Sequence, residues 1–105
     1  MKVKKKPYEI IISPEAENEL NISKEFYDSK QENLGKGFVK EVDNTIDRIA
    51  ENPEQFPKVK QKQVRKARVN RFPFGIYFAV KDNLINILAV FHYNRNPKKL
   101  NKRLK

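Results

Sequence analysis

The sequence predicts an α+β fold: a single domain in the order β-α-α-β-β-β, with a helical hairpin packed on a curved, mainly antiparallel sheet. Apolar residues recur at helical spacing between 14 and 51, whereas short runs of β-branched and aromatic residues fill 8–12 and 65–91. The chain has 105 residues and no repeat, linker or low-complexity segment. That length supports one modest core, so 1–105 is predicted to be one domain, with a basic tail at about 97–105.

The first predicted elements are a strand and a helix. Tyr8–Ile12 is a short β-prone run, too brief for a helix. Ser13, Pro14 and Glu15 then supply an N-cap, a proline at the first helical position and an acid that suits the helix dipole. A helix is therefore predicted over 14–31. Its apolar stripe consists of Ala16, Leu20, Ser23 and Tyr27, widened by Ile22 and Phe26.

A second helix is predicted within 33–51, after the break NLGKG at 33–37. One side of this helix is apolar and the other is charged, and the apolar side consists of Phe38, Val42, Ile46, Ile49 and Ala50. Asn52 and Pro53 end it. The short link between the two helices indicates an antiparallel hairpin.

Three strands are predicted after a loop at 53–63, at roughly 65–70, 72–80 and 84–91. Strict alternation in the last strand divides its side chains between the two faces of the sheet. One face has Leu84, Asn86, Leu88 and Val90, and the other has Ile85, Ile87, Ala89 and Phe91. Because both faces are mostly apolar, this strand is predicted to be central. Asp82 and Asn83 are predicted to form a two-residue turn in which both tolerate positive φ.

Charge divides the chain into two unlike halves. The net charge is +10, from 23 Lys and Arg against 13 Asp and Glu. Residues 1–54 hold 9 basic and 12 acidic residues (−3), whereas residues 55–105 hold 14 basic residues and the single acid Asp82 (+13). Such an imbalance is typical of a protein that binds a polyanion, either nucleic acid or an acidic protein.

Composition also excludes several classes of protein. The chain has no cysteine and one histidine, so disulfides and a zinc site are excluded, and neither a metal nor another cofactor is predicted. No apolar run approaches the ~20 residues of a membrane-spanning helix, so no membrane association is expected. The basic start MKVKKKPYEIII lacks the apolar length of a secretory signal, which favours a cytoplasmic location.

The stretch ILAVFHYNRNP at 87–97 holds the candidates for catalysis. His92 could act as a general base, while Arg95, close to Arg68 or Arg71, could hold a phosphate. The alternative is structural: His92 bonds backbone at the end of the sheet, and Arg95 pairs with an acid of the second helix. If the protein is a nuclease, the catalytic candidates are therefore His92, Arg95 and Arg71.

A wider set of residues is predicted to bind a target or nucleic acid: Arg65, Lys66, Arg68, Arg71, Tyr77, His92, Tyr93 and Arg95. The first four form a basic edge, extended by Lys58, Lys60 and Lys62, that either binds an anion or protects an edge strand from aggregation. The two tyrosines either stack on bases or belong to the core. Leu100 and Leu104, four residues apart in the tail, either form a short docking helix or fray.

The order of motifs resembles the RelE/ParE superfamily of type II toxin–antitoxin toxins. The resemblance spans about residues 7–97 and rests on SPEA at 13–16, FY at 26–27, LGKGF at 34–38, IAENPEQFP at 49–57, RFPFGIYF at 71–78 and AVFHYNRNP at 89–97. It implies a small bacterial toxin that is silenced by a cognate antitoxin, an acidic and partly disordered protein.

The superfamily has two main activities, and the residues favour one of them. RelE-type members cleave ribosome-bound mRNA, and that branch usually places an arginine where this chain has Phe74-Gly75-Ile76-Tyr77 and a Tyr or His where it has Leu100 and Leu104. RFPF and AVFHYNR look more like ParE-type members, which poison DNA gyrase by binding and have no established catalytic residue. The sequence therefore favours a ParE-like binding toxin, with the metal-independent endonuclease as the alternative.

Overall fold

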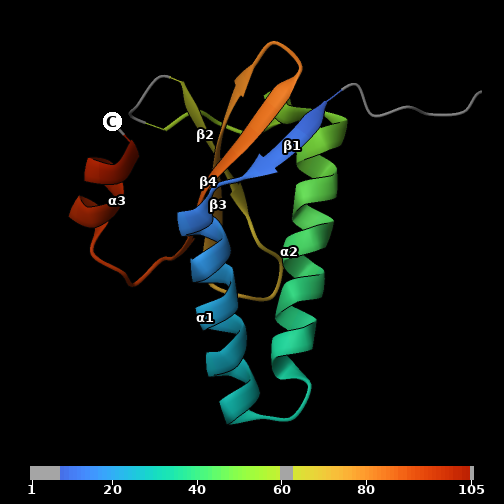
Figure 1. Cartoon of the computed structure of the whole chain (residues 1–105), viewed down its shortest axis with the longest axis vertical. Coiled ribbons are helices and arrows are strands. Elements are labelled where there is room, and N and C mark those ends of the chain that lie inside the picture. The colour runs from blue at the N-terminus through green and yellow to red at the C-terminus, as the bar shows by residue number, and fades with distance from the viewer. Residues whose placement is uncertain (1–7, 60–62, 105) are drawn as a thin grey trace, which may run out of the picture.

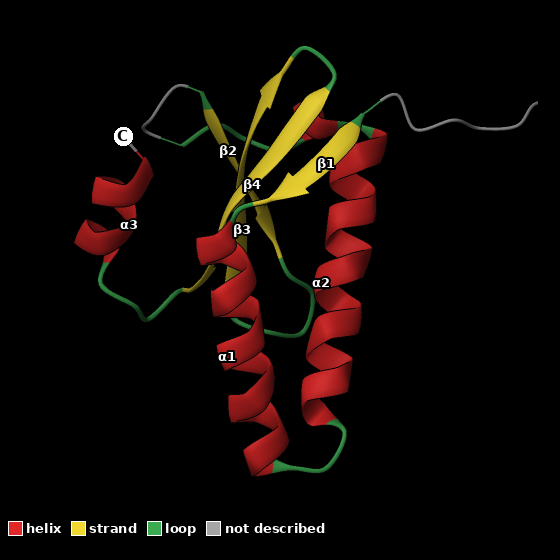
Figure 2. Ribbon diagram, in the orientation of Figure 1, coloured by secondary structure: helices red, strands yellow, loops and turns green. Residues whose placement is uncertain are grey.

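The computed structural model describes residues 8–59 and 63–104. Its elements are β1 Glu9–Ile12, α1 Pro14–Lys30, α2 Leu34–Glu51, the 3₁₀ turn η1 Pro53–Gln55, β2 Val64–Arg68, β3 Phe74–Lys81, β4 Leu84–His92 and α3 Pro97–Leu104 (Figure 2). The predicted order β-α-α-β-β-β is confirmed, and the basic tail adds the helix α3. Within the described ranges, no helix has the length and apolar character needed to cross a bilayer.

The four strands form one mixed sheet in the order β1-β4-β3-β2. β1 runs parallel to β4, and the other two pairings are antiparallel. β4 lies between β1 and β3, so the prediction that it is central is confirmed. α1 and α2 cover one face of the sheet, here called the hairpin face, and α3 lies on the opposite side, the α3 face (Figure 1).

The main core lies between α1, α2 and the hairpin face. Phe38 and Val42 of α2 and Ile76 of β3 have no exposed surface. In this core, the ring centre of Tyr27 lies 5.0 Å from that of Phe72 in a favourable edge-to-face arrangement. Each fully buried side chain of this size contributes about 1.5–3 kcal/mol, so this layer supplies most of the driving force for folding.

A β-bulge makes the prediction of strict alternation in β4 wrong. Tyr77 pairs with Ala89 but the next residue, Phe78, pairs with Ile87, so Leu88 is an extra residue on β4. After the extra residue, the side chains that would have pointed to one face of the sheet point to the other. Ile85 and Ile87 therefore share the hairpin-face core with Val90, whereas Ala89 and Phe91 pack on the α3 face with Leu100 of α3.

The predicted apolar stripe of α1 is wrong at its edge. Ala16, Leu20 and Tyr27 face the core, but Ile22 and Phe26 are 57% and 55% exposed. The physical reason is the helical repeat of 3.6 residues per turn: Ile22 and Phe26 lie roughly 100–140° around the helix from the line of Ala16, Leu20 and Tyr27. Their side chains therefore point away from the core.

Two turns differ in detail from the predictions. β2 ends at Arg68 and β3 begins at Phe74, because residues 69–73 form a turn closed by the bond from the Val69 N–H to the Phe74 carbonyl, with Arg71 at φ 71°. In the hairpin between β3 and β4, only Asp82 has positive φ (56°), which corrects the prediction for Asn83.

The link between α1 and α2 depends on a close approach at Gly35. Its N–H donates to the Asp28 carboxylate at 2.8 Å, and the other oxygen of that carboxylate accepts from Lys24 Nζ at 2.9 Å. A Cβ at Gly35 would lie 2.4 Å from the Lys24 carbonyl oxygen, a distance that backbone atoms do not tolerate. Gly37, two residues on in the same helix, has nothing within 4 Å of such a Cβ.

We predict that Gly35→Ala lowers the free energy of unfolding by about 1–3 kcal/mol, because the methyl group forces the two helices apart. The matched control Gly37→Ala should raise it by about 0.5–1 kcal/mol, since alanine favours an unobstructed helix position. Urea denaturation of both variants measures the difference. Equal effects of the two substitutions would contradict the close approach.

Candidate functional site

Four of the predicted binding residues converge on the α3 face: Lys66 and Arg68 of β2, Tyr77 of β3, and Tyr93 just after β4. We call this set the basic–aromatic cluster. Lys66 Nζ lies 4.4 Å from the centre of the Tyr93 ring and 5.8 Å from that of Tyr77. The Arg68 guanidinium carbon lies 5.5 Å from the Tyr93 ring centre. These are cation–π distances, so the rings hold the two cations in place.

Gly75 leaves the space in which the cluster forms. A Cβ at this position would lie 3.0 Å from Lys66 Cε, 3.2 Å from Tyr77 Cε1 and 3.3 Å from Tyr93 Cε1. Gly75 pairs with Arg68 on β2 and with Phe91 on β4. Paired positions share a face and successive residues of a strand alternate between faces, so Gly75 lies on the same face as the cluster. A Cβ at this position would therefore require these side chains to shift by a few tenths of an ångström.

The cluster carries unbalanced positive charge. Burial, and then the charge of Arg68, lower the pKa of Lys66, while burial raises the pKa of Tyr77 and of Tyr93. The Tyr93 hydroxyl is buried and has no hydrogen-bond partner within the described residues. The ion pairs formed between described residues involve Lys24, Arg71, Arg95 and Arg103, but none of the cluster. An anionic ligand suits such a site.

The other two basic residues of the predicted edge point elsewhere. The Arg65 guanidinium donates to the carbonyls of Phe56, at 2.6 Å, and Glu54, at 3.3 Å, and so secures the loop after α2. Arg71 lies in the turn before β3, 3.5 Å from the Glu41 carboxylate. Lys60 and Lys62, predicted to extend the basic edge, lie outside the described residues.

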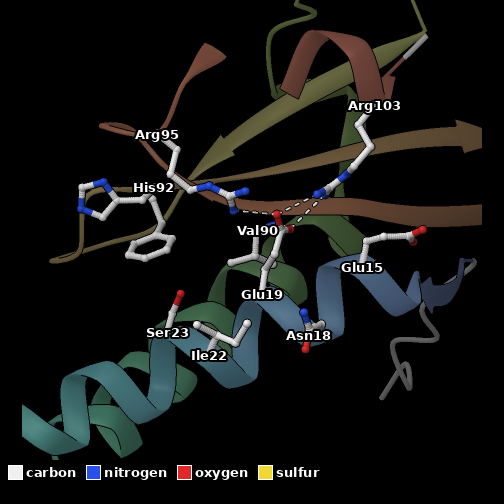
Figure 3. A pocket seen from close by; sticks show the side chains of 10 residues that line it. Glu15, Asn18, Glu19, Ile22, Ser23, Val90, His92, Arg95 and Arg103 are labelled. Carbon is white, nitrogen blue, oxygen red and sulfur yellow. Dashed lines mark hydrogen bonds and ion pairs between the residues drawn. The ribbon is translucent and has the colours of Figure 1, made fainter. Parts of the chain in front are cut away.

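A second constellation centres on the buried carboxylate of Glu19 in α1, which is 8% exposed. Its Oε1 accepts from the Val90 N–H at 3.0 Å and from Arg103 Nη2 at 2.9 Å. Its Oε2 accepts from Arg95 Nη1 at 2.8 Å and from Arg103 Nη1 at 2.7 Å (Figure 3). We call these contacts the Glu19 junction. Arg95 thus pairs with an acid of α1, which corrects the predicted pairing with the second helix.

The Glu19 junction sits directly on the β-bulge. The carbonyl of the extra residue, Leu88, accepts from Arg103 Nη2 at 2.8 Å and from the Ser13 hydroxyl at 3.3 Å. The hydrogen bonding that Arg103 donates to Glu19 is the largest cause that raises the pKa of Arg103. The junction therefore ties α1, β4 and α3 together where β1 ends.

A cavity of about 410 Å³ opens beside the junction, between α1 and β4, and His92 lines it together with Phe74 and Arg95. The rings of His92 and Phe74 are 5.0 Å apart. His92 Nδ1 accepts from the Asn94 N–H at 2.9 Å, a backbone contact of the kind that the structural alternative predicted. Because Arg71 lies in a different turn against Glu41, the three catalytic candidates do not converge on one point.

Sequence reasoning missed Glu19 and Arg103. One signal was available for each: Glu19 lies three residues after Ala16 on the apolar stripe of α1, and Arg103 lies three residues after the buried Leu100. A charged residue on an apolar stripe is unusual unless it is paired. The partner could not be read from the sequence, because 84 residues separate the two.

Comparison with known families decides the classification. Residues 10–97 match the model of the family described as ParE toxin of type II toxin-antitoxin system, parDE. The chain belongs to the ParE toxin family. The predicted resemblance, including the preference for the ParE-like branch, is confirmed. In this ParE-family chain the match ends at Pro97, so nearly all of α3, with Leu100 and Arg103, lies beyond the matched residues.

Solved structures agree with the fold of this ParE-family protein. A chain of the chromosomal ParDE TA system from P. aeruginosa is 18% identical, with a TM-score of 0.73 over 84% of this chain and 98% of that one. A chain of the YoeB dimer from Staphylococcus aureus is 21% identical, with a TM-score of 0.58 over 83% and 99% of the two chains. A search of curated protein sequences gave no match.

We predict that Glu19→Ala lowers the free energy of unfolding by about 2–3 kcal/mol, because it leaves the Val90 N–H and two guanidinium groups without their acceptor. The loss is below that of a fully buried pair because Arg95 and Arg103 remain 43% and 29% exposed. Hydrogen exchange should also accelerate in α3. Glu25→Ala, an exposed glutamate of the same helix, is the control and should change stability by less than about 0.5 kcal/mol.

Proposed function

We propose that this ParE-family protein is a toxin that arrests growth by binding an essential target, with DNA gyrase as the target implied by the ParE-like motifs, and that a cognate antitoxin neutralises it. The observation that carries the proposal is the basic–aromatic cluster, a preformed set of cations without acidic partners among the described residues. Positive potential of this kind speeds and strengthens binding to an anionic surface. The position of Arg71 against Glu41, outside the cavity that His92 and Arg95 line, supports binding rather than cleavage.

One observation favours the alternative, a RelE-type endonuclease acting on ribosome-bound mRNA. Lys66, whose pKa is lowered by burial, lies beside Tyr93 and Arg68. Metal-independent RNA cleavage requires groups that accept a proton from a 2′-OH and stabilise charge on the phosphate, and lysine, tyrosine and arginine can do so. Detection of cleaved mRNA separates this activity from inhibition by binding alone.

For the antitoxin, we propose a binding site along α1 and the β1 edge of the sheet. Ile22 and Phe26 on α1, and Ile11 and Ile12 on β1, are the large apolar side chains most exposed among the described residues. The sequence indicated the surface of the two predicted helices, 14–31 and 33–51, together with the basic edge of the sheet. At β2, however, the segment before the strand already occupies the outer edge, since Val59 N–H donates to the Val64 carbonyl. An amphipathic helix and an added strand fit the α1 and β1 surfaces.

We predict that the protein co-purifies with the product of the neighbouring antitoxin gene, and that Ile22→Glu combined with Phe26→Glu weakens this complex by at least about 30-fold. Both side chains are exposed, so the substitutions should leave the fold intact. Asn21→Glu, at an exposed site of the same helix, is the charge control and should retain binding. Full binding by the double variant would exclude this binding site. If the product of the neighbouring gene never co-purifies at low salt, it is not the antitoxin of this protein.

We predict that expression of the protein without its antitoxin arrests bacterial growth and that Lys66→Glu combined with Arg68→Glu relieves the arrest, through a roughly 100-fold loss of target affinity. Lys40→Glu and Lys81→Glu, at exposed sites away from the cluster, should remain toxic at matched expression. Arg71 and Arg95 are unsuitable for reversal because they face Glu41 and Glu19. Codon-positioned mRNA cleavage would instead support the endonuclease, and relief by the control variants would place the toxic surface elsewhere.

A further inference from the structure

The basic–aromatic cluster continues into a cleft at the β2 edge. The cleft has a volume of about 350 Å³ and is lined by Arg48, Phe56, Pro57, Lys66 and Arg68. Arg48 comes from the last turn of α2, and its Nη2 lies 3.5 Å from the Arg68 carbonyl oxygen. Three cations from two elements distant in sequence therefore surround one small opening.

The walls of the cleft are fixed by hydrogen bonds and ring packing. The Pro57 carbonyl accepts from the Lys66 N–H at 3.0 Å, and the Phe56 carbonyl accepts from Arg65 Nη1 at 2.6 Å. The Phe56 ring lies 6.0 Å from the ring of Phe78, which belongs to the main core. A ligand thus meets a preformed site and orders little chain on binding.

The groups around the cleft indicate the chemistry of the ligand. Arg48, Lys66 and Arg68 form no ion pair with a described carboxylate. The buried Tyr93 hydroxyl beside them lacks a hydrogen-bond partner in the described part of the chain. A phosphate presents several charged oxygens in different directions and so can accept from two guanidinium forks and an ammonium group at once.

We propose that this cleft and the adjoining cluster bind the phosphodiester backbone of a nucleic-acid strand, with Arg48, Lys66 and Arg68 as the phosphate-binding residues. The inference deepens the proposed function and rests on it in one respect, that this face is the toxic surface. An acidic peptide fits less well, because peptides on a sheet edge bind by adding a strand. Here Lys58 and Val59 already pair along β2.

The geometry further specifies how the strand is recognised. Lys66 and Arg68 stand over the Tyr93 ring, so that ring is not free to stack on a base. Contacts with phosphates carry no sequence information, and binding should therefore be independent of base sequence. Three neutralised phosphates correspond to a slope of about −2 for log K against log salt on a single strand.

The test measures binding of the purified full chain to fluorescent oligonucleotides of about 12 nucleotides, as single-stranded DNA, RNA and duplex DNA. Fluorescence anisotropy is followed from about 50 to 200 mM KCl. Arg48→Gln, Lys66→Gln and Arg68→Gln should each make the slope shallower by about 0.7 on a single strand. Lys40→Gln and Lys81→Gln remove the same charge at exposed sites elsewhere and should leave the slope unchanged. Circular dichroism melting checks that each variant is folded.

Three results would overturn the inference: no binding at the lowest salt, an equal effect of the control variants, or displacement of the oligonucleotide by polyglutamate at equal charge concentration. The last would assign the cleft to an acidic protein. The three oligonucleotides distinguish a single strand from a duplex, and DNA from RNA. Growth arrest without oligonucleotide binding would reject the nucleic-acid site but leave the proposed toxin function standing. Oligonucleotide binding without growth arrest would reject the toxin function but leave the nucleic-acid site standing.

Discussion

The hydrogen bonds and ion pairs of the Glu19 carboxylate fix how α1, β4 and α3 are arranged. β1 ends at Ile12, opposite Ile87, so β4 continues past the Leu88 bulge without β1 beside it, and its backbone groups on that side need other partners. Glu19 accepts from the Val90 N–H, and its negative charge holds Arg95 and Arg103. Transferring such charges from water is costly, so the junction contributes less to net stability than to fixing one arrangement of α1, β4 and α3.

The bulge also decides what each face of the sheet presents. Its phase reversal sends Ile87 and Val90 to the hairpin face and Ala89 and Phe91 to the α3 face, so β4 supplies apolar side chains to two separate cores. α3 covers the second of these cores through Leu100, while the β2 side of the same face carries the cations. The α3 face therefore has a packed half and a charged, exposed half.

Folding concentrates the charge asymmetry that the sequence shows along the chain. Most acids of the first half lie on the two helices, where Glu41 pairs with Arg71 and Glu19 pairs with Arg95. The cations that remain without such a partner include Arg48, Lys66 and Arg68, which line the cleft at the β2 edge. The two edges of the sheet therefore differ: exposed apolar side chains lie along α1 and β1, and basic side chains line the cleft at β2.

The sequence by itself determined the fold class, the order of the elements, the central position of β4, the ParE-like family and the surplus of positive charge. The family came from the resemblance of its ordered motifs, and the other properties follow from short-range periodicity, capping residues and composition, which neighbouring residues encode. Only the tertiary structure decided that Lys66 and Tyr93 meet over Gly75, that Arg65 turns away, and that Glu19 binds Arg103. Those contacts join residues far apart in the chain, and their geometry depends on the strand register and on the Leu88 bulge, which alternation alone does not reveal.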